Sequence, residues 1–398
     1  MNYTKNFELA GNELKIKDLN LYWRVGKKKI FSKIPSRLNF SIYFDKEHGF
    51  LRQDVSPKLN QALNQIYIEN ENIGYLREDN TLAKGYHEDF LEFILENISD
   101  IYLKNVLEIG CGGCTILNAL KENNVKVTGL DPSPFALECA RKFNIKIINK
   151  FFDKELIDQK FDLTFFSDVL EHIERPIQFL KDLTSCLEPK SKIIIAVPDT
   201  TTEQLYGDIS MCMHQHINYF TARSLKNVFH ESGLKTLKII KSGYGGSLYG
   251  LVEVPNKIER ELYRKSASII PLNKEFNFFK KVKLVIRKFK NIFDKAIHKK
   301  ILFHCYCPLR ALPYLAAIGE MDNKIIRFID DTPYWNNSFF DGSEVIINSL
   351  NDSEISNDDF IFIFSNTFED KIKRKLLNKG FNEKNIFSLS NLFDIEYT

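Results

Sequence analysis

The sequence predicts an α/β protein built on a parallel β-sheet, and three observations support that prediction. Short apolar runs alternate with segments of helical periodicity from residue 105 to residue 199. Such alternation is typical of parallel strands joined by helices that cover both faces of the sheet. A glycine-rich turn follows the first apolar run, and an acidic residue follows the second. Both features fall at the carboxyl ends of strands, where sheets of this kind bind their ligands.

The central stretch is Lys104–Asp131, which reads KNVLEIGCGGCTILNALKENNVKVTGLD. This stretch contains, in order, a buried strand, a glycine turn at Gly110 and Gly112, a helix and a second strand. Asp131 ends the second strand, 21 residues after Gly110. This order brings backbone N–H groups and a helix N-terminus to a ligand, and it places a carboxylate where a ribose diol can bind.

The remaining elements of the central region follow from the same periodicities. The expected strands are 105–109, 126–130, 145–149, 161–166 and 192–197, and the expected helices are 114–123, 133–142 and 175–187. Before them we expect a helix over Tyr86–Leu103. After them we expect a helix over Ala222–Ser232 and strands over Thr236–Lys241 and Leu248–Val254.

The turn differs from the dinucleotide-binding fingerprint, because Thr115 stands where a third glycine belongs. Glu108 lies two residues before Gly110 and completes an E-x-G-x-G pattern, and the run Asp168-Val-Leu-Glu-His172 follows the fourth strand. Together with Asp131, this pattern resembles the class I S-adenosylmethionine-dependent methyltransferases over about residues 86–253. The resemblance implies a Rossmann-like methyltransferase domain, an enzyme of the transferase class and S-adenosyl-L-methionine as its cofactor.

The resemblance also implies which residues bind that cofactor. Gly110 and Gly112 would let the backbone close on its amino acid portion, and Asp131 would accept hydrogen bonds from both ribose hydroxyls. Glu108 would contact backbone or the cofactor amine. The remaining expected cofactor-binding residues are Pro132, Phe152 and Asp153 beside the adenine, Ser167 and Asp168 along the methionine part, and Tyr86 at the start of the preceding helix.

The candidate catalytic residues are His216, His214 and Tyr219, which lie in the stretch MHQHINYFT. A histidine with an ordinary pKa suits proton abstraction near neutral pH. His216 is the preferred base or acceptor-orienting residue, and capping of a backbone carbonyl is the alternative role for either histidine. For His172 we expect packing beside the cofactor. No residue is assigned to a metal.

A narrower resemblance, over about residues 45–398, is to the sugar C-methyltransferases. It rests on the stretch HQHINYFT, on Gly245-Gly246-Ser247-Leu248, and on Ile329-Asp330-Asp331 with Phe340-Asp341-Gly342. That family implies a sugar or nucleotide-linked sugar as acceptor, in surface glycan or secondary-metabolite biosynthesis. This chain has Met213 and Gln215 where the family has a tyrosine and a glutamate, and it lacks the family's zinc-binding N-terminal cysteines. Because enolising a ketone needs a base and an oxyanion stabiliser, methylation of a hydroxyl stays open beside carbon methylation.

Two other functions remain as alternatives. An NAD-dependent sugar-nucleotide oxidoreductase would want a third glycine in the turn, and the short-chain enzymes of that class want a Tyr-x-x-x-Lys pair, which does not occur in this sequence. A non-catalytic cofactor-binding or scaffold protein is the second alternative, because the family's zinc module and tyrosine are missing.

The sequence divides into four predicted parts. Residues 1–80 form a β-rich or mixed module, with strands over Leu21–Ile34 and Leu38–Phe44 and a helix over Ser56–Ile68. Residues 81–255 are the methyltransferase domain, and residues 256–300 are a basic helical linker. Residues 301–398 form a second, degenerate Rossmann-like domain, whose first strand is followed by a turn without glycine; we therefore expect it to bind no nucleotide.

Composition and charge limit the classes of partner that we expect. A net charge of +3 in 398 residues gives no reason to expect a nucleic-acid partner, and seven scattered cysteines suit a reducing compartment. No apolar run reaches the length of a membrane span, and we expect a cytoplasmic enzyme that acts on a small molecule. The basic stretch 274–300 has two interpretations, a helix for weak contact with a membrane surface or partner and, preferred, a helix with one face on a domain.

Overall fold

The computed structural model describes residues 6–21, 25–26, 34–69, 81–98, 105–121, 125–256, 259 and 278–393. The chain forms two compact units, which are described separately. Unit 1 consists of residues 1–44, 201–214 and 273–398, and unit 2 of residues 45–200 and 215–272. This division differs from the four predicted parts, because the N-terminal and C-terminal segments belong to the same unit.

Unit 2 contains the central stretch and the elements on either side of it. Its helices and 3₁₀ turns are α1 (Pro57–Glu69), α2 (Thr81–Ile98), α3 (Thr115–Lys121), α4 (Pro134–Lys142), η1 (Lys154–Leu156), η2 (Leu170–His172), α5 (Pro176–Ser185) and α7 (Ala222–Glu231). Its strands are β5 (Phe50–Gln53), β6 (Asn105–Ile109), β7 (Lys126–Leu130), β8 (Lys146–Ile148), β9 (Phe161–Ser167), β10 (Leu187–Pro198), β11 (Asn218–Tyr219), β12 (Lys235–Lys241) and β13 (Ser247–Glu253).

Seven of these strands form one sheet in the order β12-β13-β10-β9-β6-β7-β8. Strands β8, β7, β6, β9 and β10 are parallel, and β13 pairs antiparallel with both β10 and β12. The chain proceeds outward from β6 to β8 and then returns to place β9 on the other side of β6. Strand order therefore reverses between β6 and β9, and the carboxyl ends of these two strands flank the position where parallel sheets bind ligands.

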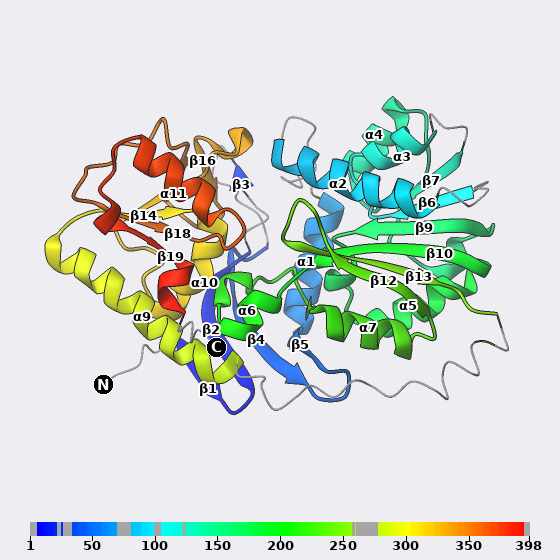
Figure 1. The fold of residues 1–398 in the computed structure, drawn as a ribbon, viewed down its shortest axis with the longest axis horizontal. Coiled ribbons are helices and arrows are strands. Elements are labelled where there is room, and N and C mark those ends of the chain that lie inside the picture. The colour runs from blue at the N-terminus through cyan, green and yellow to red at the C-terminus, as the bar shows by residue number, and fades with distance from the viewer. Residues whose placement is uncertain are drawn as a thin grey trace. The chain divides into compact units, whose positions relative to one another are not determined.

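Two helical layers cover this sheet, as Figure 1 shows: α2, α3 and α4 lie on one face, and α5 and α7 on the other. Alternate residues of the central strands face the two layers, as the pleat requires. In β9, Phe165 joins the cluster of α2, α3 and α4, whereas Phe166 joins the cluster of α5 and α7. Two apolar cores therefore hold the sheet rigid from both sides, and the ligand-binding edge is held with it.

The sequence-based prediction of this sheet is confirmed. All five strands expected between residues 105 and 199 are present, and each expected helix there overlaps an observed one. The two strands after α7 are also present, as β12 and β13. The main differences are at the ends: α2 begins at Thr81, and β10 begins five residues early, before a register irregularity between Leu187 and Lys192. Residues 99–103 of the helix expected over Tyr86–Leu103 lie outside the described residues.

Unit 1 contains two groups of elements. The first is an antiparallel group of β1 (Phe7–Ala10), β2 (Glu13–Asn20) and β4 (Arg37–Asp45). The second is a seven-stranded sheet of order β19-β18-β14-β15-β17-β16-β3. Its members are β3 (Val25–Gly26), β14 (Phe303–Tyr306), β15 (Ile326–Ile329), β16 (Ser338–Phe340), β17 (Ile346–Asn348), β18 (Phe360–Ile363) and β19 (Ile386–Ser388). Its helices and 3₁₀ turns are α6 (Thr201–Tyr206), η3 (Ile209–Met211), α9 (Phe278–Lys299), α10 (Pro308–Ile318), η4 (Pro333–Trp335), α11 (Glu369–Asn378), η5 (Glu383–Asn385) and η6 (Leu389–Leu392).

The N-terminal strands begin earlier than predicted. The predicted strand over Leu38–Phe44 is present within β4, but β1 and β2 lie before Leu21, where no strand was expected. In β2, Leu14 and Ile16 are buried while Lys15 between them is exposed. That alternation marks a half-buried strand in the sequence and was overlooked. Of the predicted strand over Leu21–Ile34, residues 22–24 and 27–33 lie outside the described residues.

Helix α9 corrects the membrane-surface interpretation of the basic stretch. Its apolar side chains are buried, and Phe289 lies 5.1 Å from the ring of Tyr314 and 5.3 Å from that of Phe362. The apolar face therefore packs on the C-terminal sheet of unit 1, and its lysines occupy the rest of the surface. Such a face is not available to a lipid surface. Among the described residues, no helix combines the length and the apolar character that a membrane crossing requires.

Candidate functional site

The glycine turn after β6 is held in a conformation that only glycine adopts without strain. Gly110 has φ +71° and Gly112 has φ +42°. The Gly110 N–H donates to the Leu130 carbonyl at 2.7 Å, and the Gly112 N–H donates to Asp131 Oδ2 at 3.0 Å. The ends of β6 and β7 are thereby fixed to each other, and the predicted pair of glycines meets the predicted aspartate.

Asp131 is buried, and each of its carboxylate oxygens accepts one backbone N–H. The donor to Oδ1 is Ser133 at 2.8 Å, and the donor to Oδ2 is Gly112. Asn149 donates to the Asp131 carbonyl at 2.8 Å and fixes the backbone as well. A carboxylate has about four acceptor positions, so two remain after these bonds. The side chain is therefore held in one orientation and can still accept two hydroxyl donors.

The turn also approaches the end of β9 closely. A Cβ atom at Gly110 would lie 2.6 Å from Val169 Cγ2. We predict that Gly110→Ala lowers the free energy of unfolding by roughly 1–2 kcal/mol for the left-handed backbone alone and also weakens cofactor binding, because the turn must move away from Val169. Urea denaturation and calorimetric titration with S-adenosylhomocysteine measure the two effects.

The matched control for that variant is Gly380→Ala. Gly380 has φ +86°, and a Cβ atom there meets nothing within 4 Å. This control should show the stability loss and leave cofactor affinity unchanged. If Gly110→Ala binds S-adenosylhomocysteine as tightly as the control does, the glycine turn does not form the cofactor site.

Glu108 lies near this turn in β6. It is 6% exposed, and its Oε2 has no hydrogen-bond partner. Burial, and next the nearby Cys114 and Asp131, raise the pKa of this carboxyl well above its usual value. Cys111 and Cys114 are free thiols whose sulfur atoms lie 3.8 Å apart. A buried acid with an unsatisfied oxygen suits a cationic donor such as an amine, which agrees with the expected role.

On the other side of the strand-order reversal, β9 ends at Ser167 and Asp168. Asp168 has φ +53°, and its N–H donates to the Ala196 carbonyl of β10 at 3.1 Å. The Ser167 hydroxyl donates to Asp168 Oδ2 at 3.3 Å. Burial raises the pKa of Asp168 to about 6. The structure thus places both residues at the carboxyl end of β9, as the sequence predicts.

The other expected cofactor residues have mainly packing contacts. Phe152 stacks edge-on against Phe179 at 5.1 Å, and Asp153 caps η1 by accepting the Glu155 N–H at 3.0 Å. Pro132 is half-buried between Asp131 and Ser133. In α2, the ring of Tyr86 lies 4.7 Å from Tyr244 in the loop between β12 and β13. Contact of these four residues with a cofactor stays a prediction.

His214 has a local structural environment. It belongs to unit 1, is fully buried, and its Nε2 lies 3.1 Å from the Leu19 carbonyl. Phe40 of β4 lies edge-on to its ring at 5.6 Å. Burial lowers the pKa of His214 to about 4, although the carbonyls of Leu19 and Leu38 act in the opposite direction. The alternative role considered for it, carbonyl capping, fits these contacts, and we assign no catalytic role to it.

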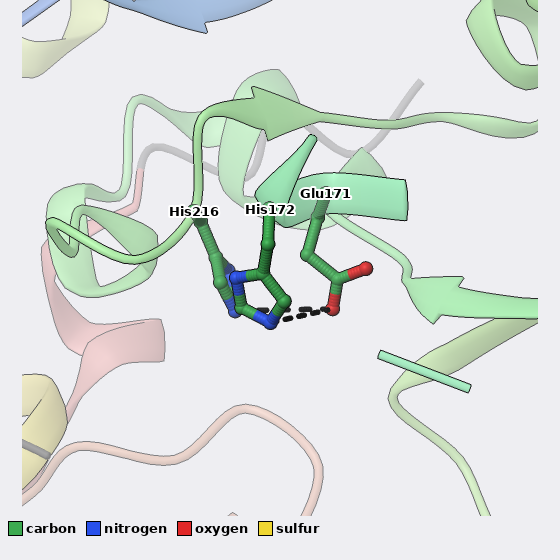
Figure 2. A group of neighbouring side chains, drawn as sticks. All are labelled: Glu171, His172 and His216. Atoms are coloured by element: carbon green, nitrogen blue, oxygen red, sulfur yellow. Dashed lines mark ion pairs between the residues drawn. The ribbon is translucent and has the colours of Figure 1, made fainter. Parts of the chain in front are cut away.

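His216 faces two residues of the run that follows β9, as Figure 2 shows. Its Nε2 lies 4.0 Å from Glu171 Oε1, and His172 Nε2 lies 3.7 Å from the same oxygen. The two imidazole rings are 5.1 Å apart. Residues 171 and 216 are distant in sequence, so the fold alone brings the three side chains together. The run Asp168-Val-Leu-Glu-His172 is visible in the sequence, but no pattern within it predicts a role for Glu171.

Backbone contacts hold this group in place. The Ile217 N–H donates to the Glu171 carbonyl at 2.7 Å, and the Asn218 side chain donates to the carbonyls of Leu170 and Ile173 at 3.2 and 2.7 Å. Gln53 of β5 donates through its side chain to the His216 carbonyl at 3.1 Å. These hydrogen bonds therefore join the 3₁₀ turn η2 to the segment of strand β11, and they fix the backbone that carries the three side chains.

The electrostatics of the group are unusual. Glu171 is 1% exposed, and burial, and next the Asp168 carboxyl, raise its pKa well above the usual value. Burial lowers the pKa of His172 to about 4, so its ring is neutral near neutral pH. Strongly perturbed groups that gather at a ligand-binding sheet edge are typical of functional sites.

Two tyrosines lie beside the three side chains. The ring of Tyr219, in β11, is 6.3 Å from that of His216, and the Tyr219 side chain is fully buried. The ring of Tyr67, in α1, is 6.0 Å from that of His172. The Tyr67 hydroxyl is buried without a hydrogen-bond partner, and burial, and next the charge of Glu171, raise its pKa. Tyr219 thus lies near His216, and its catalytic role stays a prediction, whereas Tyr67 is a residue that the sequence patterns do not indicate.

Comparison with known proteins identifies the central region. Residues 75–239 match a protein family described as "Methyltransferase domain". Residues 75–239 are thus similar to a methyltransferase domain. The match covers the glycine turn, Asp131 and the group around Glu171, and it agrees with the predicted enzyme class. The sheet order described above is the Rossmann-like α/β fold expected for it.

Individual relatives match parts of this domain. A mitochondrial ubiquinone biosynthesis O-methyltransferase of Schizosaccharomyces pombe is 26% identical over 135 residues, which cover 32% of this chain and 49% of the relative. A tRNA U34 carboxymethyltransferase of Nautilia profundicola is 30% identical over 162 residues, 35% of this chain and 51% of the relative. The chain thus spans about half the length of these relatives.

Among solved structures, the N-methyltransferase NodS from Bradyrhizobium japonicum WM9, in complex with S-adenosyl-L-homocysteine, is 16% identical to this chain. That comparison covers 50% of this chain and 99% of NodS, with a TM-score of 0.37.

Proposed function

We propose that this protein transfers a methyl group from S-adenosyl-L-methionine to a hydroxyl of a small-molecule acceptor. S-adenosyl-L-methionine is the cofactor of the methyltransferase domain. One observation supports the proposal most strongly. The glycine turn and Asp131 follow β6 and β7, on one side of the position where strand order reverses. Glu171 and His172 follow β9 on the other side, and His216 faces Glu171.

The cofactor would bind on the glycine turn. The two free acceptor positions of Asp131 would take the ribose hydroxyls, and Gly110 and Gly112 would let the backbone approach the amino acid part. Glu108 would hold the cofactor amine, and Ser167 and Asp168 would line the methionine part. Pro132, Phe152 and Asp153 would border the adenine, and Tyr86 would cover it from α2.

Catalysis would then depend on orientation and proton removal. The sulfonium already carries an activated methyl group, so the protein has to hold the acceptor oxygen in line with it and remove the hydroxyl proton. We assign these tasks to His216 with Glu171 and His172, and a supporting contact to Tyr219. Glu171 and His172 both lie in the turn after β9, whereas His216 lies in another segment. His216 can therefore contact an acceptor from a different direction than the turn does.

For the acceptor we propose a sugar or nucleotide-linked sugar, in glycan or secondary-metabolite biosynthesis, on the strength of the stretch HQHINYFT and the loop Gly245-Gly246-Ser247. The names of the relatives favour a second acceptor class. Proteins named ubiquinone biosynthesis O-methyltransferase match 28–50% of this chain, and such an acceptor carries a phenolic hydroxyl. An acceptor panel therefore has to contain both classes.

The experiment combines binding with turnover. Calorimetry with S-adenosylmethionine and with NAD should give one site for the first and none for the second; the reverse result would favour the oxidoreductase alternative. Release of S-adenosylhomocysteine is then measured with sugar nucleotides and with hydroquinones of increasing side-chain length. Cofactor binding without turnover on any member of either class would favour the non-catalytic alternative.

A further inference from the structure

The group of Glu171, His172 and His216 has the geometry of a metal-binding site. One ligand atom from each residue, a carboxylate oxygen and two imidazole nitrogens, lies within 4.8 Å of the other two. Figure 2 shows the three side chains pointing toward one another, with both rings directed at a single oxygen of Glu171. A tetrahedral ion with ligands at about 2.1 Å separates its ligand atoms by about 3.4 Å. Inward movements of a few tenths of an ångström would bring Glu171 and the histidines to that spacing.

The tautomer of His172 supports this interpretation. Its Nδ1 lies 2.7 Å from the Gln215 carbonyl, and because a carbonyl only accepts, Nδ1 must carry the hydrogen. In the neutral ring, Nε2 then presents a lone pair to Glu171 Oε1. A metal-binding histidine commonly donates its other ring N–H to a carbonyl in this way, which fixes the orientation of the ring.

Glu171 supplies a second, independent observation. Its side chain is 1% exposed, and neither carboxylate oxygen has a hydrogen-bond partner. Two imidazole nitrogens lie 3.7 and 4.0 Å from Oε1, and the Asp168 carboxyl also lies beside Glu171. A buried carboxylate in such surroundings is costly unless a cation compensates it. A cation at the point toward which the three ligand atoms converge would compensate it.

We propose that Glu171, His172 and His216 bind one divalent transition-metal ion. Two imidazoles and one carboxylate favour zinc or cobalt over magnesium, which prefers oxygen ligands alone. Three protein ligands leave one coordination position open, as in catalytic zinc sites. The role of the ion rests on the proposed function and would replace that of His216 as a base. An acceptor hydroxyl at the open position would release its proton to water more readily, because the ion stabilises the oxygen anion that remains.

Binding of Co²⁺ to the untagged full chain, first stripped with a chelator, tests the proposal. Calorimetry should give one site per chain, and visible absorption should show the bands of a four- or five-coordinate cobalt ion. Glu171→Gln keeps the side-chain volume and removes the charged ligand. It should weaken Co²⁺ binding by at least about tenfold, since even changes outside the ligand shell cost about 10–100-fold. His216→Gln is the second variant and should behave alike.

Two control variants match these substitutions. Glu174→Gln makes the same change three residues further along, at an exposed position. His48→Asn removes a partly exposed imidazole that pairs with Asp45 at 2.8 Å and lies 3.9 Å from Glu231. Both should bind Co²⁺ as the unaltered chain does. If Glu171→Gln and His216→Gln bind Co²⁺ with unchanged affinity, or if His48→Asn alone loses binding, the metal site is not the one proposed.

Titration of the same samples with S-adenosylhomocysteine separates this proposal from the proposed function. Retained cofactor binding without Co²⁺ binding would overturn the metal site and leave the methyltransferase intact. Co²⁺ binding without cofactor binding would do the opposite. Far-UV circular dichroism and cofactor affinity show whether each variant is folded. Because Glu171→Gln keeps the side-chain volume and replaces a buried carboxyl group that has no hydrogen-bond partner, its thermal stability without metal should equal or exceed that of the unaltered chain.

Discussion

Replacing His216 by alanine should lower methyl-transfer turnover by about 10²–10⁴-fold while leaving cofactor affinity within about twofold. The reason is positional. His216 faces Glu171 and lies just before β11, whereas the glycine turn and Asp131 follow β6 and β7. Turnover is measured as S-adenosylhomocysteine release with the best acceptor of the panel, and affinity by calorimetry.

His48→Ala serves as the control for this prediction. His48 is a partly exposed histidine of the same unit, held by Asp45 and outside the group around Glu171. Its loss should leave turnover and cofactor affinity unchanged. Equal turnover in His216→Ala and His48→Ala would exclude His216 from the mechanism, whether it acts as a base or as a ligand. A loss of cofactor affinity in His216→Ala would instead point to a disturbed fold.

Replacing Asp131 by alanine should weaken S-adenosylhomocysteine binding by about 1–3 kcal/mol, or roughly 5–150-fold in Kd. Two effects combine. The ribose hydroxyls would lose a charged acceptor, and the N–H groups of Gly112 and Ser133 would lose the oxygens that position them. Turnover at saturating cofactor should fall much less than affinity, since no reacting atom is removed.

Asp162→Ala is the matched control for Asp131→Ala. Asp162 also accepts a backbone N–H, that of Asn105 at 2.8 Å, but at the amino ends of β6 and β9. Both variants remove a carboxylate that satisfies backbone, so both should lower stability, and only Asp131→Ala should weaken cofactor binding. Equal affinities in the two variants would mean that the ribose binds elsewhere.

Much of the fold of unit 2 could be predicted because its signals are local. Each strand from 105 to 199 is a short apolar run, and each helix has its own apolar stripe, so periodicity locates them one by one. Gly110, Gly112 and Asp131 were predictable for a related reason. A turn with positive φ favours glycine, and the acid directly follows the next strand.

The unit boundaries and the role of α9 could not be predicted in the same way. Lysines and phenylalanines at helical spacing describe any amphipathic helix, and the sequence does not state which surface covers the apolar face. The contacts of Phe289 with Tyr314 and Phe362 settle that question. The assignment of residues 201–214 to unit 1, although they lie between segments of unit 2, likewise depends on contacts between distant residues.

The sequence by itself determined the α/β sheet and the glycine turn that meets Asp131, because periodicity and backbone conformation depend on neighbouring residues. Only the tertiary structure decided which histidine faces the site. His214 and His216 are two residues apart and look equivalent in sequence, yet His214 meets the Leu19 carbonyl and His216 meets Glu171. The partner of each ring comes from a distant part of the chain, and the folded chain alone brings such partners together.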